Sequence, residues 1–241
     1  MSRLRVLLYH NISPDGHRDD LTVSAAQLED QFQYLHREGY NSISLSDLVA
    51  HCDNGKPLPP RPVLLTFDDG FRNCATIAYP LAKKYHIKIN LFVIPLFIQS
   101  GHYRSIPCLR PADMEKMDPA LVEIGLHSHF HVSYAELRPF DLEFDIDRCL
   151  QSLQEMGIDY QPCLAYPFGA FPRRRRADQR QLFDLLQRKG IRLAFRIGNR
   201  INPLPLREKF LIQRIDIRGN ESFATFRLSL AFGRKSLFFL Y

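Results

Sequence analysis

The chain has 241 residues, of which 45% are hydrophobic and 24% charged, so it is long enough to bury a substantial core without covalent staples. Its five cysteines include no CxxC spacing, which argues against a disulfide framework and against a thiolate zinc site. Reduced cysteines in a cytosolic compartment are the simpler interpretation. The formal net charge of +6 favours encounter with anionic partners.

The expected elements alternate between strands and helices. In chain order, they are a strand at 6–9, a helix after Ser24 that stops at Gly39, a strand at 63–67, a helix from Pro80 to about His86, strands at 89–94 and 122–125, a helix at 139–156, a strand at 163–166, a helix at 176–189, strands at 191–197 and 211–217, and a short helix from about Glu221. Ser24 and Gln27 also have the spacing of a capping box.

No internal repeat or linker divides the chain, so we expect residues 1–241 to form a single domain. Alternation of short buried strands with helices predicts an α/β protein with a parallel sheet, open or closed. In a barrel of this kind, catalytic groups lie at the C-terminal ends of the strands. Four polar or turn clusters follow four expected strands: His10, Asp68-Asp69, His127, and Tyr166-Pro167-Phe168-Gly169.

Two of these clusters have chemistry of their own. Asp68 and Asp69 are adjacent carboxylates after an apolar strand, an arrangement that is costly to bury without a cation, although Asp-Gly is also a common turn. His127 and His131 are four residues apart and would share one face if the segment were helical, with His129 pointing elsewhere. Two imidazoles and a carboxylate suit Zn²⁺, whereas the alternative is a surface histidine cluster without a ligand.

These motifs resemble the polysaccharide deacetylase family (NodB homology, carbohydrate esterase family 4). Residues 66–70 read Thr-Phe-Asp-Asp-Gly, residues 127–131 read His-Ser-His-Phe-His, and residues 167–169 read Pro-Phe-Gly. Residues 8–11 and 165–169 are similar to the branch that deacetylates poly-N-acetylglucosamine. The likeness spans about residues 6–217 and implies a distorted (β/α) barrel of about seven parallel strands.

The resemblance also implies roles for individual residues. Asp69, His127 and His131 would bind one divalent metal ion, Zn²⁺ first, with Co²⁺ or Ni²⁺ as alternatives. Asp68 would be the general base. The segment Tyr166, Pro167, Phe168 and Gly169 would line the substrate, with the Phe168 N–H stabilising the oxyanion.

The chain departs from the family pattern in three ways. It has no histidine after Lys209, where the catalytic acid usually lies, so His10 is the candidate acid. Ala165 stands where an arginine usually orients the base, and Arg214 is the candidate replacement from the last strand. The family's Asp-x-x-Asp-Trp motif is missing, because the chain has no Trp.

We therefore expect a metal-dependent hydrolase that removes N-acetyl groups from N-acetylhexosamine units of a glycan, glycolipid or surface-polysaccharide precursor. The alternatives are an amidohydrolase for a non-sugar amide and a catalytically silent glycan-binding relative. The sequence leaves the sugar and the oligomeric state open.

The chain ends and the basic residues bear on location and partners. Residues 6–9 are too short for a secretory signal and no run reaches transmembrane length, so a cytoplasmic protein is expected unless the natural start lies upstream. The four arginines at 173–176 are usually a solvated loop or helix start; otherwise they could steer an acidic or phosphorylated glycan, or touch an anionic membrane or a lipid-linked substrate. No aromatic interleaving or reader motif accompanies them, so no nucleic-acid partner is expected.

Overall fold

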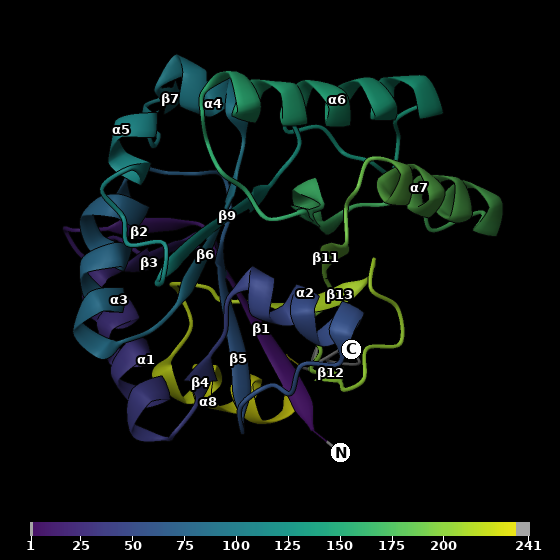
Figure 1. Cartoon of the computed structure of the whole chain (residues 1–241). Helices are drawn as coiled ribbons and strands as arrows, with labels where there is room; N and C mark the ends of the chain where they lie inside the picture. The colour runs from purple at the N-terminus through teal and green to yellow at the C-terminus, as the bar shows by residue number, and fades with distance from the viewer. Residues whose placement is uncertain (1, 235–241) are drawn as a thin grey trace, which may run out of the picture.

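A computed structural model describes residues 2–234 of the protein. Seven parallel strands form a closed barrel (Figure 1): β1 (Arg3–Tyr9), β5 (Pro62–Phe67), β6 (Ile89–Val93), β9 (Val122–Leu126), β10 (Cys163–Ala165), β11 (Leu193–Ile197) and β13 (Ile212–Asp216). The ring closes because β1 pairs with β5 on one side and with β13 on the other. The predicted barrel of about seven parallel strands is confirmed.

The pairing between neighbouring strands of the barrel is uneven. β9 and β10 share a single residue pair, Leu126 with Leu164, whereas β6 and β9 share five. Two short strands extend the sheet: β4 (Asn41–Ser42) runs parallel to β5, and β12 (Asn202–Pro203) runs antiparallel to β1. Separate small ladders join β2 (Asn11–Ser13) to β3 (Thr22–Ser24) and β7 (His102–Tyr103) to β8 (Ile106–Pro107).

Helices surround the barrel (Figure 1). They are α1 (Ala25–Arg37), α2 (Leu45–Asn54), α3 (Tyr79–Tyr85) after a π-helical turn η1 (Cys74–Ala78), α4 (Pro95–Ser100), α5 (Pro111–Met114), α6 (Pro139–Glu155), α7 (Arg176–Arg188) and α8 (Phe223–Phe232). Among residues 2–234, none of these helices has the length and apolar character needed to span a bilayer.

Most predicted elements are present within two residues of their expected ends, but α2, α4 and α5 were missed. The Ser24 hydroxyl accepts a hydrogen bond from the Gln27 N–H at 3.1 Å, as a helix cap does. The reciprocal half of the predicted capping box was wrong, because the Gln27 side chain donates to the Glu221 carbonyl of a distant loop instead. Tertiary contact therefore overrides a local motif here.

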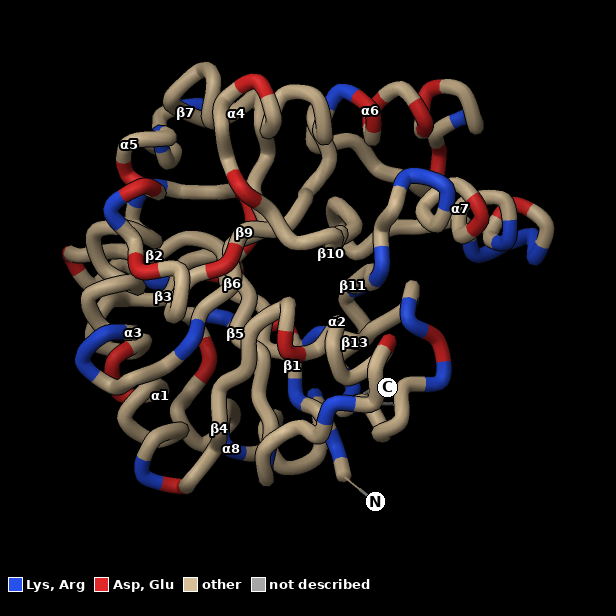
Figure 2. The backbone as a smooth tube through the Cα atoms, in the orientation of Figure 1, with Lys and Arg blue, Asp and Glu red and all other residues tan. Residues whose placement is uncertain are grey.

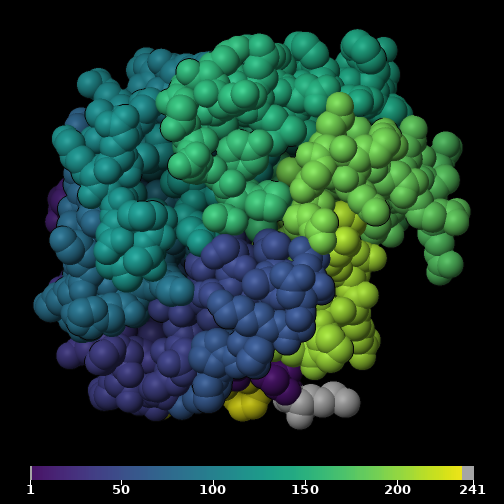
Figure 3. Space-filling model, viewed as in Figure 1, coloured from purple at the N-terminus to yellow at the C-terminus, as the bar shows by residue number. Residues whose placement is uncertain are grey.

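The hydrophobic core has two layers because alternate residues of each strand face opposite sides. Leu4 and Val6 of β1 pack inside the barrel with Phe92 and Phe195, while Leu7 of the same strand packs outward against the helices. α2 adds to the inner layer through Leu45 and Leu48. Figure 3 shows residues of the α2 region on the face of the molecule nearest the viewer.

Candidate active site

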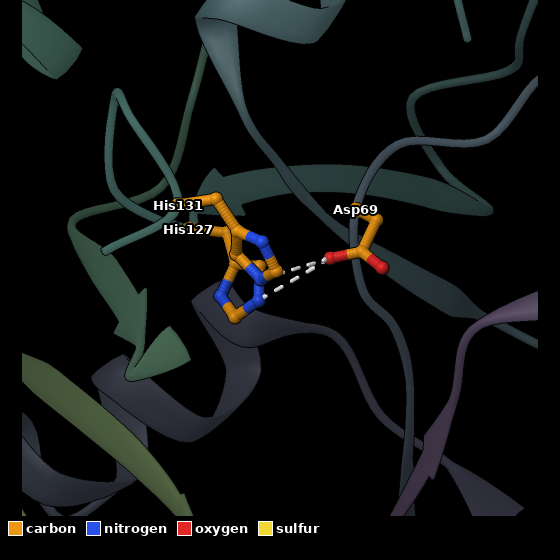
Figure 4. Close-up of side chains that lie close together, drawn as sticks. All are labelled: Asp69, His127 and His131. Carbon is orange, nitrogen blue, oxygen red and sulfur yellow. Dashed lines mark ion pairs between the residues drawn. The ribbon is translucent and has the colours of Figure 1, made fainter. Parts of the chain in front are cut away.

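The three predicted ligands meet at the C-terminal ends of β5 and β9, which lie on either side of β6. Asp69 follows β5, His127 follows β9, and His131 lies four residues further along the same loop. One ligand atom from each residue lies within 4.8 Å of the others. The Asp69 Oδ1 atom is 3.6 Å from His127 Nε2 and 3.5 Å from His131 Nε2, and Figure 4 shows both rings directed at this oxygen. The spacing suits a single shared cation.

The His127–His131 segment is a loop, so the one-face-of-a-helix interpretation was wrong. Ser128 and His131 have left-handed backbones, with φ of 67° and 55°. These two reversals, rather than helical spacing, bring the imidazoles together. His129 is buried away from the other two rings, and its Nδ1 has no hydrogen-bond partner among the described residues.

A buried carboxylate, Asp145 of α6, holds this loop. Its Oδ1 accepts hydrogen bonds from the Ser128 hydroxyl at 2.9 Å and from the N–H groups of His129 and Phe130 at 3.1 and 3.0 Å. Its Oδ2 accepts from the Tyr134 hydroxyl at 2.6 Å. The sequence analysis missed Asp145, although its place within the apolar stripe of the predicted helix was a usable signal, since an acidic side chain there requires buried donors.

The donor set fits a divalent cation. The His127 Nδ1 lies 2.8 Å from the Ala165 carbonyl, which can only accept, so Nδ1 carries the proton and Nε2 keeps its lone pair towards the cluster. Burial, together with the charge of His127, lowers the pKa of His131 to about 4, so its ring is neutral at pH 7. Asp69 Oδ1 is buried without a hydrogen-bond partner, and burial raises the pKa of Asp69. A cation would satisfy this oxygen.

Asp68 has different surroundings from its neighbour. Arg214 of β13 is fully buried and donates to both carboxylate oxygens, at 2.6 and 2.7 Å. Burial alone would raise the pKa of Asp68, but the Arg214 and His127 charges lower it to about 2. Asp68 is therefore an anion held in one orientation, 3.5 Å from His127 Nε2. The structure thus pairs Arg214 with Asp68, the residue that the sequence analysis expected it to contact.

His10 lies near the same carboxylates. It follows β1 directly, and its charge contributes to lowering the pKa of both Asp68 and Asp69. Its Nδ1 atom is buried without a partner among residues 2–234.

The segment at 166–169 divides into buried and exposed parts. Phe168 has a φ of 58° and is 63% exposed as a residue, and its ring centroid lies 4.6 Å from that of His131. Tyr166 and Pro167 are buried, and the Tyr166 hydroxyl donates to the Phe210 carbonyl. The structure leaves these two side chains no surface for the predicted substrate contact. At Gly169, φ is 63° and a Cβ would lie 2.6 Å from the Ile197 nitrogen, so glycine is required for this loop shape.

Known proteins share both the motifs and the fold. The family model described as polysaccharide deacetylase matches residues 55–185, which include the Asp68-Asp69 and His127–His131 motifs. The chain belongs to the polysaccharide deacetylase family. Its fold is also that of solved family structures: the Streptococcus pyogenes deacetylase PplD in complex with acetate superposes with a TM-score of 0.78 at 21% identity, covering 95% of this chain and 98% of that one.

Two curated relatives are similar to more than half of the chain. YxkH of Bacillus subtilis (strain 168), which bears a provisional polysaccharide deacetylase name, is 26% identical over 70% of this chain and 58% of its own length. A poly-beta-1,6-N-acetyl-D-glucosamine N-deacetylase of Staphylococcus epidermidis is 26% identical over 61% of this chain and 54% of its own length. The chain thus spans somewhat more than half the length of these relatives.

Proposed function

We propose that this family member is a metal-dependent N-deacetylase that hydrolyses the acetamido group of an N-acetylhexosamine in a glycan. The observation that carries the proposal is the contrast between two adjacent carboxylates. Asp69 lies with His127 and His131 in a cluster suited to Zn²⁺, while Asp68 is held apart by Arg214 as a separate anion. A base beside a cation site is the arrangement that amide hydrolysis by water requires.

Asp69, His127 and His131 would hold the metal ion, which when bound polarises the acetyl carbonyl and makes water a better nucleophile. Asp68 accepts the proton of the attacking water. Arg214 keeps that carboxylate ionised, and its two hydrogen bonds fix which lone pairs remain free for the proton.

Two further groups complete the reaction. The Phe168 N–H stabilises the oxyanion that forms when water adds to the acetyl carbon. His10 donates a proton to the amine nitrogen as the carbon–nitrogen bond breaks, so that acetate and a free amino sugar leave. The position of His10, directly after β1 and near both Asp68 and Asp69, supports this role.

Poly-N-acetylglucosamine oligosaccharides are the first substrates to test, because the Staphylococcus epidermidis relative is named for that glycan. Acetate release is measured after chelation and again after addition of Zn²⁺, Co²⁺ or Ni²⁺, with simple acetamides as a comparison. We expect release from the oligosaccharide that depends on added metal and is lost in Asp68→Asn. Undiminished release after chelation would contradict metal dependence, and undiminished release by His10→Ala would exclude His10 as the acid.

A further inference from the structure

Two arginines, Arg173 and Arg196, lie beside the loop at 166–169, and the charge of a third, Arg200, acts on Arg196. Arg173 precedes α7, Arg196 lies on β11, and Arg200 lies in the loop after β11. The Arg173 and Arg196 guanidinium carbons lie 5.0 and 5.1 Å from the centroid of the same ring, that of Phe171. In Figure 2, basic segments of β11 and of the chain entering α7 lie on the same side of the barrel. We refer to Arg173, Arg196 and Arg200 as the arginine rim.

No carboxylate of residues 2–234 pairs with the arginine rim, whereas Arg192, Arg214, Arg218 and Arg234 each have a carboxylate partner. Arg173 and Arg196 make only long hydrogen bonds, to the Gly169 and Ile197 carbonyls at 3.4 and 3.3 Å. Burial, with the charges of Arg173 and Arg200, lowers the pKa of Arg196. Like charges held together without a counterion are unfavourable, and a bound anion would relieve their repulsion.

The arginine rim is connected to the metal cluster through one short segment. Phe168 lies against His131 of the metal cluster. The next residue, Gly169, packs on Ile197, and its carbonyl accepts the Arg173 hydrogen bond. The ring of Phe171 lies beneath the guanidinium groups of Arg173 and Arg196. If the acetamido group of a substrate lies at the metal cluster, we therefore expect another group of the same substrate to lie near the arginine rim.

We propose that the arginine rim binds a phosphate group that is covalently attached to the acetylated sugar substrate. Guanidinium groups match the oxygens of phosphate with paired N–H donors. Three guanidinium groups together have more N–H donors than a single carboxylate can accept, which favours phosphate over a carboxylate ligand. The preferred substrate would then be a glycosyl phosphate or phosphorylated glycan rather than a neutral polymer. This inference rests on the proposed deacetylase function for the acetamido end of the substrate.

The kinetic test compares a neutral N-acetylglucosamine oligosaccharide with the same oligosaccharide carrying a terminal phosphate. We expect the phosphorylated compound to have a KM at least about tenfold lower. Arg196→Gln should raise that KM about tenfold while leaving kcat and the neutral substrate unchanged, and Arg196→Lys should keep part of the preference. The control is Arg188→Gln, which removes the same charge from an exposed position on α7. Equal KM values for the two wild-type substrates, or a preference unchanged in Arg196→Gln, would overturn the proposal.

A binding measurement separates this inference from the proposed function. Calorimetric titration of pyrophosphate into wild type and Arg196→Gln reports the arginine rim without any turnover. Binding that Arg196→Gln weakens, in a protein that releases no acetate, would support the arginine rim and contradict the deacetylase function. Acetate release from both substrates without measurable pyrophosphate binding would overturn the rim and leave the deacetylase standing.

The source of the phosphate is distinguished by two further substrates. One is a water-soluble glycosyl phosphate, and the other is a prenyl-linked glycosyl diphosphate presented in detergent micelles. A KM lowered for the soluble compound alone identifies a soluble sugar phosphate as the source, and one lowered for the micellar compound alone identifies a lipid-linked precursor; either supports the site. Failure of Arg196→Gln to change the KM of the preferred compound contradicts it.

Discussion

Arg214 and Arg196 lie on adjacent paired strands, β13 and β11, yet they have opposite surroundings. Arg196 pairs in register with Gln213, one residue from Arg214. Arg214 points into the barrel, over Phe92, and has Asp68 as its carboxylate partner. Arg196 points outward, over Phe171, without one. Because alternate residues of a strand face opposite sides, Arg214 is buried against a carboxylate while Arg196 lies outside the barrel without one.

The largest expected effect comes from comparing two single variants, in which Arg214 or Arg196 is replaced by methionine. Arg214→Met leaves the Asp68 carboxylate buried without its cation, so the free energy of unfolding should fall by about 3–5 kcal/mol. Arg196→Met removes a cation from a repulsive cluster, and unfolding should change by no more than about 0.5 kcal/mol. Denaturant titration of both variants measures this. A similar fall in the free energy of unfolding of the two variants would contradict the difference between the paired Arg214 and the unpaired Arg196.

The second prediction concerns the neighbouring carboxylates inside the barrel. Asp68→Asn should lower kcat by about 10²–10⁴-fold while metal affinity remains, because the proposed mechanism makes Asp68 the base and not a metal ligand. Asp69→Asn should instead weaken metal binding directly. Metal content after dialysis, measured beside acetate release, distinguishes these outcomes. Loss of metal from Asp68→Asn would contradict the division of roles.

The third prediction is a pH dependence of stability in the metal-free protein. The pKa of His131 is about 4 in the folded chain and 6.5 in the unfolded chain, so the unfolded chain binds the proton first as pH falls. Falling pH between 6.5 and about 4 should therefore reduce the free energy of unfolding, by up to about 3 kcal/mol from this group. Above pH 6.5 the effect is absent. His131→Gln should reduce the change in the free energy of unfolding between pH 6.5 and about 4, as measured by denaturant titration at several pH values. The same pH dependence in this variant would contradict the assignment to His131.

The smallest effect tests the support of the histidine loop. Asp145→Ala should weaken metal affinity about 10–100-fold, since it removes the acceptor for three donors between the ligands. Asp145→Asn retains one acceptor oxygen and should lose less. Chelator competition measures both, and the Co²⁺ absorption spectrum reports ligand geometry. If Asp145→Ala unfolds, Asp145→Asn still provides the test, because unchanged affinity and spectrum in that folded variant would contradict the role.

Local pattern predicted much of the framework. Apolar runs followed at once by Asp68-Asp69 and His127 indicated strands with polar ends, and parallel strands in a barrel bring such ends together. α4 was missed because it spans only six residues. α2 did have a usable signal, since Leu45, Leu48, Val49 and Cys52 have helical spacing after a Ser44–Asp47 capping box. The helical interpretation of His127 and His131 failed because two left-handed residues cannot be inferred from spacing.

The sequence by itself determined which residues stand at the strand ends, because burial of a strand and exposure of its end are local properties of composition. Only the tertiary structure decided which side chains meet there. Arg214 and Asp68 are 146 residues apart, and Asp145 reaches the histidine loop from a separate helix. Such pairings depend on strand register and on the parity that sends Arg214 inward and Arg196 outward, which no single segment encodes.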